Sequence, residues 1–178
     1  TGIENSELVA EYKYDTDNLR IRKDSVEEGV MYFIYSLDGV VLYEENGGDY
    51  IEYVYVNGKH GDGSERETCY YVIDHLGSTV MMTDAEGSVV WQDELTPFGE
   101  SSGEAGHKHN LAKFTGKAMD DETGLYYFNA RWYDPGIGQF ITEDPAKDGV
   151  NWFVYCHNNP LKYVDPDGKF AGVTIGVV

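Results

Sequence analysis

The sequence predicts an all-β fold of stacked antiparallel β-hairpins of one repeating type, followed by a segment with a short helical turn. The 15 tyrosines and 21 glycines among 178 residues are typical of short strands joined by tight turns. Strand-like runs alternate with Asp, Asn and Gly turns through residues 9–59. An aromatic-x-x-Asp/Ser motif, a turn, a β-branched strand and a Gly turn recur about every 20 residues, which predicts hairpins that bury a face only against their neighbours.

The expected strands of the first third are short and bounded by turn residues; they are 9–15, 19–26, 30–36, 40–45 and 50–56. The same pattern returns in residues 70–94, which predicts a further hairpin unit there. Residues 60–68 and 100–112 are polar, and each predicts a loop, the second of them mobile.

The last third of the chain differs in texture, because aromatic residues are denser there. Residues 125–133 predict one strong strand, and residues 138–144 contain a second, shorter one. Residues 149–160 predict one or two helical turns that stop at Pro160. Residues 161–168 predict an extended segment that closes in a turn.

The net charge of the chain is strongly negative. Thirteen Lys and Arg residues against 32 Asp and Glu residues give a formal charge of −19. This balance argues against nucleic-acid binding and against attachment to an anionic membrane surface through bulk electrostatics. No run of residues reaches transmembrane length, so no membrane insertion by this segment is expected.

The cysteines and histidines do not predict a metal site or another cofactor site. Cys69 and Cys156 match no metal-ligand spacing; two buried free thiols are expected, although a fold that brought them close would allow a disulfide. His107 and His109 lie two residues apart in a polar stretch without further ligands nearby, so a solvated pair is expected.

Three Asp-Pro steps stand out in the aromatic last third: Asp134-Pro135, Asp144-Pro145 and Asp165-Pro166. Proline disfavours the α region for the residue before it, so each step predicts a turn or an extended corner. Such corners can project carboxylates from rigid positions, and acids gathered between aromatic walls are suited to acid–base chemistry. The alternative is that each Asp side chain only caps its own turn.

Several motifs resemble those of one known family. Residues 70–100 resemble the start of the Rhs repeat-associated core domain, while GLYYFNARWYDPGIGQFITEDP and NNPLKYVDPDG resemble its end. The segment YKYDTDNLRIRK and its echoes resemble the tyrosine-aspartate (YD) repeats that precede that core. The resemblance implies YD hairpins over residues 1–68, the core domain over 69–169, and the start of a passenger over 170–178.

Members of this family are large secreted or injected bacterial proteins. The resemblance therefore implies a secreted or cell-surface bacterial protein whose spiral sheet forms a hollow shell around a C-terminal toxin. The implied partners are the rest of its own shell and that passenger. In many members the core domain is also an intramolecular aspartyl protease, which cuts the chain to free the passenger.

The resemblance implies particular site residues. The two Asp-Pro motifs of the family fall on Asp144 and Asp165, and the arginine before them falls on Arg131. Some relatives place an Asp at the position of Asp134. The implied cleavage site follows Lys169, or lies near Phe170.

Three departures from the family pattern favour a catalytically inactive module. Trp132 stands where some relatives carry Asp, and Lys169 stands where cleaving members commonly carry Leu. Lys147 stands two residues after Pro145, where the first family motif often has Gly. If the chain does cut itself, Asp144 with Asp165 or Asp134 would share a proton and activate a water, while Arg131 would orient a carboxylate or stabilise the oxyanion. Arg131 could instead stack on an aromatic ring.

Two alternatives to a self-cleaving shell remain at this point. One is an inactive wall or plug, and the other is an adhesion or carbohydrate-binding β-scaffold with exposed Tyr and Trp. Each would leave open sheet edges, which predict oligomerisation or a covering partner unless the segment closes into its own barrel-like core.

Overall fold

A computed structural model describes residues 10–36, 41–56, 59–62, 68–147, 149–169 and 173–174 of the chain. The protein divides into two compact units, Thr1–Glu52 and Tyr53–Val178. Strand β5 runs from the first unit into the second. No helix among these residues is long and apolar enough to cross a membrane.

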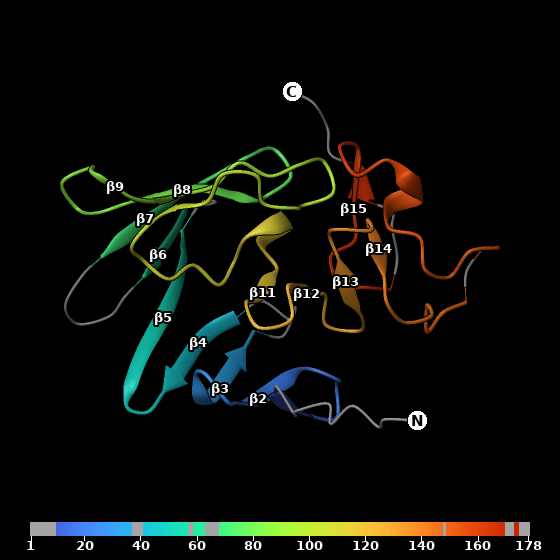
Figure 1. The fold of residues 1–178 in the computed structure, drawn as a ribbon, viewed down its shortest axis with the longest axis horizontal. Helices are drawn as coiled ribbons and strands as arrows, with labels where there is room; N and C mark the ends of the chain where they lie inside the picture. The colour runs from blue at the N-terminus through green and yellow to red at the C-terminus, as the bar shows by residue number, and fades with distance from the viewer. Residues whose placement is uncertain are drawn as a thin grey trace, which may run out of the picture. The chain divides into compact units, whose positions relative to one another are not determined.

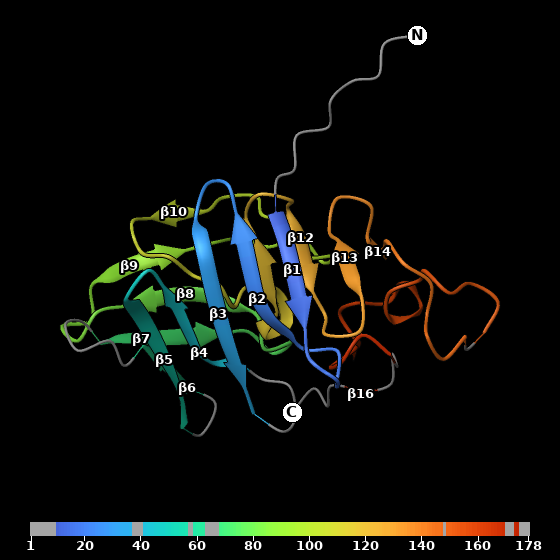
Figure 2. The ribbon, with the colours of Figure 1, turned by 90° about the horizontal axis from the view of Figure 1, so that it is seen from below.

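The first unit is an antiparallel meander in which each strand pairs with the next (Figure 2). Its strands are β1 (Ala10–Tyr14), β2 (Arg20–Ser25), β3 (Gly29–Tyr35), β4 (Val41–Asn46) and the first part of β5 (Asp49–Val56). These positions confirm the strands predicted for residues 9–56. The alternation of aromatic and charged residues lets one face of each strand be buried while the other is solvated.

The buried face of the first unit contains an arginine. Arg20 is 1% exposed, and its guanidinium carbon lies 4.5 Å from the centre of the Phe33 ring. Burial raises the pKa of Tyr35 to about 12, although the nearby Arg20 charge acts in the opposite direction. The face is therefore assembled by stacking a planar cation on aromatic rings, as well as by apolar contact.

Aspartate caps the hairpin turns in one recurring way. The Oδ1 atom of Asp74 accepts the amides of Leu76 and Ser78, and its own amide donates to the Ser78 carbonyl. Asp15 and Asp84 make the same three bonds in their own turns. This Asx geometry explains why the repeating motif needs Asp at the end of the aromatic strand.

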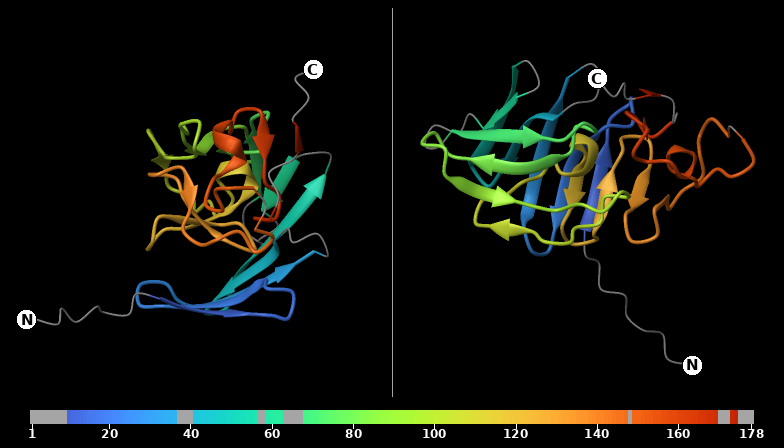
Figure 3. Two further views of the ribbon diagram at one scale, coloured as in Figure 1. Left: turned by 90° about the vertical axis from the view of Figure 1, so that its right-hand side faces the viewer. Right: turned by 90° about the horizontal axis from the view of Figure 1, so that it is seen from above.

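The second unit continues the meander. The strands after β5 are β6 (Lys59–Asp62), β7 (Cys69–Ile73), β8 (Thr79–Thr83), β9 (Val89–Gln92) and β10 (Ala105–Gly106), and each pairs with the next. The right panel of Figure 3 shows β7, β8 and β9 running side by side. The hairpins predicted for residues 70–94 are confirmed.

Two predicted loops differ from the structure. The prediction for 60–68 is wrong at its start, where β6 pairs with β5 and β7; residues 63–67 lie outside the described residues. The stretch 100–112 is not a free loop, because β10 pairs with β9 and Glu104 bonds both Trp91 and Lys113. Polar composition alone did not reveal these strand pairings and side-chain contacts.

A second, smaller sheet forms the middle of this unit (Figure 1). It contains β11 (Ala118–Asp120), β12 (Leu125–Tyr127), β13 (Trp132–Asp134) and β14 (Gln139–Phe140), in that order. The single strand predicted for 125–133 is wrong, because the chain reverses between β12 and β13. Asn129 has a φ of 61°, a left-handed conformation that Asn adopts more readily than most residues.

The segment predicted as helical turns is mostly irregular. Its one short 3-10 turn, η2 (Cys156–Asn158), has φ values of 47°, 52° and 59°, so its residues are left-handed. The preceding Val154 bridges Gln139 of β14. After η2, strand β15 (Tyr163–Val164) pairs with β16 (Val173–Thr174). The extended segment predicted for 161–168 is therefore confirmed at residues 163–164, whereas residues 161–162 form a turn.

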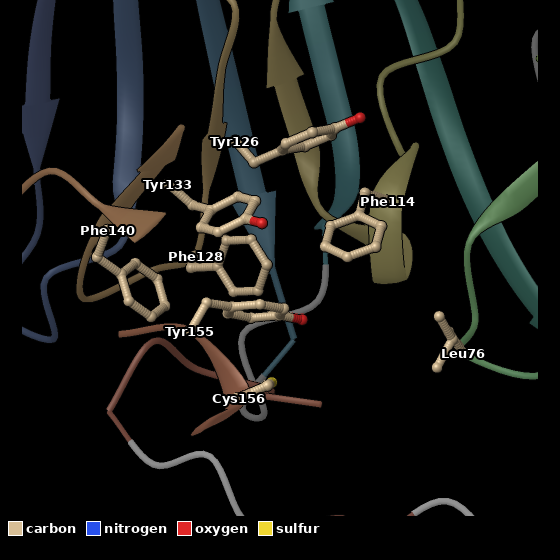
Figure 4. Close-up of a cluster of buried hydrophobic side chains, with 8 residues drawn as sticks. All are labelled: Leu76, Phe114, Tyr126, Phe128, Tyr133, Phe140, Tyr155 and Cys156. Atoms are coloured by element: carbon tan, nitrogen blue, oxygen red, sulfur yellow. The ribbon is translucent and has the colours of Figure 1, made fainter. Parts of the chain in front are cut away.

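Aromatic rings fill the core of the second unit (Figure 4). The centres of the Tyr133 and Tyr155 rings lie 4.7 Å apart. The buried cluster comprises Leu76, Phe114, Tyr126, Phe128, Tyr133, Phe140, Tyr155 and Cys156. Two hydroxyl groups at its border are satisfied by one loop: Tyr126 donates to the Gly99 carbonyl at 3.0 Å, and Tyr133 donates to the Phe98 carbonyl at 2.7 Å. The phenols thus hold residues 98–99 against the core.

The two cysteines, Cys69 and Cys156, are buried free thiols, as the sequence predicts. No group of His, Cys, Asp and Glu suited to a metal ion occurs in the described ranges.

Substitution of Gly99 tests how tightly this loop packs. Gly99 has a φ of 86°, and an added Cβ would lie 2.5 Å from Cγ of Phe114. We expect Gly99→Ala to lower the free energy of unfolding by roughly 1–2 kcal/mol for the left-handed backbone and by a further 1–3 kcal/mol for overpacking. Urea unfolding measures the sum of these two losses.

Gly87 provides the matched control, because it has the same φ of 86° and open space around its Cβ position. Gly87→Ala should show only the backbone cost. Equal losses for the two variants would contradict the packing argument.

Alkaline titration tests the buried phenols. Burial raises the pKa of Tyr126, Tyr133 and Tyr155 above the ordinary value of 10.0. Their contribution to stability is therefore complete below pH 10 and is lost as the pH rises toward the folded-state pKa values. We expect a late, cooperative rise in tyrosinate absorbance that coincides with loss of near-UV circular dichroism. A smooth titration of all 15 tyrosines around pH 10 with native dichroism would contradict this expectation.

Candidate functional site

Arg131 joins three segments of the second unit. It follows the turn between β12 and β13 and is 4% exposed. Its Nε donates to the Gly168 carbonyl at 2.5 Å, its Nη1 to the Trp152 carbonyl at 3.1 Å, and its Nη2 to Oδ2 of Asp165 at 3.1 Å. The guanidinium carbon lies 3.6 Å from the centre of the Phe140 ring. Arg131 therefore both stacks on an aromatic ring and pairs with a carboxylate, two of the three roles that the sequence left open.

Asp165 is the buried partner of this arginine, with an exposure of 1%. While Oδ2 faces Arg131, Oδ1 accepts the amides of Gly168 at 2.8 Å and Lys169 at 3.2 Å. The Asp167 amide, at 3.4 Å, is a weaker third donor to the same oxygen. Every one of these neighbours is a donor, so the arrangement suits an ionised carboxylate, which only accepts.

The turn from Asp165 to Gly168 is held through successive carbonyl groups. The carbonyl of Pro166 accepts from Nζ of Lys117 at 2.5 Å, and that of Asp167 accepts from the Ala130 amide at 3.1 Å. The carbonyl of Gly168 accepts from Arg131. We call this turn, together with Lys117, Ala130 and Arg131, the terminal latch.

Gly168 is required by the latch for two reasons. Its φ is 72°, which favours glycine, and a Cβ at this position would overlap the carbonyl oxygen of Phe128. The backbone of the Asp165–Gly168 turn therefore lies directly against the β12–β13 turn. This close approach explains the glycine at the end of the Asp-Pro-Asp-Gly motif.

Asp144 lies beside the latch through a shared acceptor. Its amide donates to the Trp152 carbonyl at 3.0 Å, the same oxygen that accepts from Arg131. The residue is 7% exposed, and its Oδ1 accepts the Ala146 amide at 2.8 Å. Its Oδ2 makes no hydrogen bond within the described part of the chain. The structure thus brings the backbone of Asp144 to Arg131 and leaves one carboxylate oxygen available.

Asp134 caps its own turn. Its Oδ1 accepts the Gly136 amide at 2.9 Å, and its carbonyl accepts the Gly138 amide at 2.9 Å. Among the described residues it shares no hydrogen bond with Arg131, Asp144 or Asp165.

The predicted cleavage site begins at the edge of the latch. The amide of Lys169 is bound by Asp165 at 3.2 Å and by Asp167 at 3.1 Å. Phe170 lies outside the described residues. The amide of the Gly168–Lys169 peptide is therefore fixed, one peptide bond before the predicted cut.

Two neighbours of the site were not found by sequence reasoning. Lys117 lies in a turn 49 residues before Pro166, and no local pattern links the two. Cys156 is a core residue whose thiol pKa burial raises to about 12; the neighbouring Tyr155 and the Arg131 charge act against this shift, while Asp165 adds to it. The Cys156 thiol therefore stays protonated near neutral pH, although it lies close to the ion pair.

Comparison with known protein families gives the assignment. The Teneurin YD-shell family model matches residues 2–160. The chain belongs to this family. The resemblance to Rhs and YD-repeat proteins is thereby confirmed, and so is the all-β fold class that it implies.

Similar sequences occur in bacteria and in an insect. The chain is 32% identical over 182 residues to the tRNA nuclease WapA of Bacillus subtilis, covering 93% of this chain and 8% of WapA. It is 38% identical over 112 residues to toxin subunit YenC1 of Yersinia entomophaga, covering 57% of this chain and 11% of YenC1. It is 37% identical over 123 residues to salivary gland surface protein 1 of Aedes aegypti, covering 66% of this chain and 4% of that protein. This YD-shell segment thus spans a small part of each relative.

Solved structures show the same fold. A crystal structure of TcdB2-TccC3 without its hypervariable C-terminal region matches with a TM-score of 0.75 at 23% identity, over 94% of this chain and 9% of that one. A Tc holotoxin pore of Photorhabdus luminescens matches with a TM-score of 0.75 at 22% identity, over 100% and 10%.

Removal of the arginine tests the latch. We expect Arg131→Met to cost roughly 3–5 kcal/mol of unfolding free energy, because it leaves the Asp165 carboxylate buried without its counter-charge. Lys147 provides the control, since its ion pair with Glu143 is 3.7 Å long and its side chain is 60% exposed. Lys147→Met should change stability by less than about 1 kcal/mol. Similar midpoints for both variants in urea unfolding would contradict the latch.

Proposed function

We propose that this segment forms the C-terminal end of a YD shell, whose wall encloses a toxin-type passenger that follows in the same bacterial polypeptide. Membership of the YD-shell family supports the wall, and relatives named as a nuclease and a toxin subunit support a toxic passenger. The partners are then the rest of the shell and that passenger. The protein acts outside the producing cell or at its surface.

The terminal latch is the observation that carries this proposal. Its turn is tied through the carbonyls of Pro166, Asp167 and Gly168 and through the buried Asp165 carboxylate. A wall that must release or retain a passenger needs one fixed point at which the chain leaves it. A charge-paired turn packed on an aromatic core supplies such a point, because its bonds break only together.

The latch also prepares a self-cleavage between Lys169 and Phe170. Asp144 is the general base, since one of its carboxylate oxygens has no described hydrogen-bond partner. It takes a proton from water, the water oxygen attacks the Lys169 carbonyl carbon, and the proton then passes to the departing Phe170 nitrogen. Asp165 remains ionised and holds Arg131, and the latch keeps the peptide in place. Asp134, the other acid named from the sequence, caps its own turn and takes no part in this step.

A specific observation favours an inactive wall as the second candidate. Both oxygens of Asp165 are committed, one to Arg131 and the other to backbone amides. A carboxylate surrounded by donors is a poor proton carrier. In this case the latch serves only to anchor the chain.

Intact-mass analysis of the protein with its following segment attached tests both levels of the proposal. We expect a product ending at Lys169 in the wild type and uncut chain in Asp144→Asn. The following segment should resist an added protease while the shell is folded. Asp134→Asn is the control, because that residue caps only its own turn, and it should be cut like the wild type.

The outcomes separate the candidates. An uncut wild type at every pH, with the following segment still protected, would support the inactive wall and exclude self-cleavage. Rapid digestion of the following segment by the added protease would contradict enclosure itself.

A further inference from the structure

Lys117 occupies a rigid position at the end of the 3-10 turn η1 (Phe114–Gly116). Its amide donates to the Phe114 carbonyl at 2.9 Å, and its carbonyl accepts the Lys113 amide at 3.0 Å. Phe114 is 1% exposed and belongs to the aromatic core. The backbone of Lys117 is therefore anchored to the core, so its side chain extends from a fixed base.

The ammonium group of Lys117 lies against the terminal turn. Nζ donates to the Pro166 carbonyl at 2.5 Å and lies 5.7 Å from the centre of the Phe128 ring. Burial lowers the pKa of Lys117 below its ordinary value, while the charges of Asp165 and Asp167 act in the opposite direction. The Lys117 side chain is thus partly removed from water and lies near two carboxylates and an aromatic ring. Such surroundings are unlike those of a solvated surface lysine.

The position of Pro166 depends on the Lys117 hydrogen bond more than the positions of the other turn residues do. Proline has no backbone N–H, so its carbonyl is its only main-chain hydrogen-bonding group. The flanking residues are tied at more points: Asp165 through its carboxylate, and Gly168 through its amide and its carbonyl. Within the described contacts, Lys117 is the donor that holds the Pro166 carbonyl.

We propose that Lys117 is a positioning residue that sets the register of the Asp165–Gly168 turn against Arg131. With the Pro166 carbonyl fixed, the next carbonyls meet Ala130 and Arg131, and the Gly168 and Lys169 amides meet Asp165. The inference rests on the proposed function in one respect, since it makes Lys117 the residue that presents the Lys169 peptide. The positioning itself requires no cleavage.

Hydrogen exchange of individual amides in the 178-residue protein tests this role. In Lys117→Met we expect the Gly168 and Lys169 amides to exchange about tenfold faster, because local opening becomes easier, while core amides such as Tyr126 and Tyr133 are unchanged. Lys117→Arg should restore protection, since arginine keeps a charged donor on a long side chain. Unchanged protection at Gly168 and Lys169 in Lys117→Met would overturn the proposal, and so would failure of arginine to restore it.

Lys162 provides the matched control. It also lies near an aromatic ring, 5.1 Å from the centre of Tyr163, and its side chain is exposed. Lys162→Met should leave both amides protected; an equal loss would mean that removal of any nearby lysine loosens the turn, and would overturn the assignment. If Lys117→Met fails to fold, Lys117→Gln replaces it in the test. Partial protection of the Gly168 and Lys169 backbone amides is then expected, because the glutamine side chain can still donate a hydrogen bond.

The design keeps two failures apart. If the wild type never cuts itself, the exchange pattern still decides the role of Lys117. If the wild type does cut, Lys117→Met should slow product formation while Lys117→Arg restores it. Cleavage at the wild-type rate in Lys117→Met would overturn the positioning role and leave the proposed protease intact.

Discussion

The second unit depends on one buried arginine. The Arg131 guanidinium is neutralised by Asp165, stacks on Phe140 and donates to the carbonyls of Trp152 and Gly168. A buried charge is tolerated only when it is paired and its donors are satisfied, so these partners cannot vary independently. The Asp165–Gly168 turn is consequently fixed to the β12–β13 turn through the interior of the protein.

The aspartates show how one local device takes on a second task. Asp15, Asp74 and Asp84 use their carboxylates to cap hairpin turns, and Asp134 caps its turn in a similar way. Asp165 does the same with Oδ1, but its Oδ2 reaches Arg131. The difference arises from burial rather than from the turn itself. A site of this kind can therefore develop from a structural repeat without new local geometry.

The candidate site combines a fixed turn with one carboxylate oxygen that has no described hydrogen-bond partner. Asp165 is committed to several donors, whereas Asp144 keeps one oxygen without a described partner and is joined to Arg131 through the Trp152 carbonyl. An anchored turn and a neighbouring free acid are what a single intramolecular cut requires, since such a reaction depends on placement more than on turnover. The same anchoring suits a wall that never cuts.

The sequence by itself determined the hairpins, because strand alternation and Asp or Gly turns act over a few neighbouring residues. Through the family resemblance, the sequence also indicated Asp165 and Arg131 of the latch, but not Lys117. The reversal at Asn129 and the strand at 59–62 were decided by the tertiary structure, because strand pairing in the folded sheet overrides local propensity. The contact of Lys117 with Pro166 joins residues 49 positions apart, and a buried charge pairs with the group that lies close to it in the folded core, which no local pattern encodes.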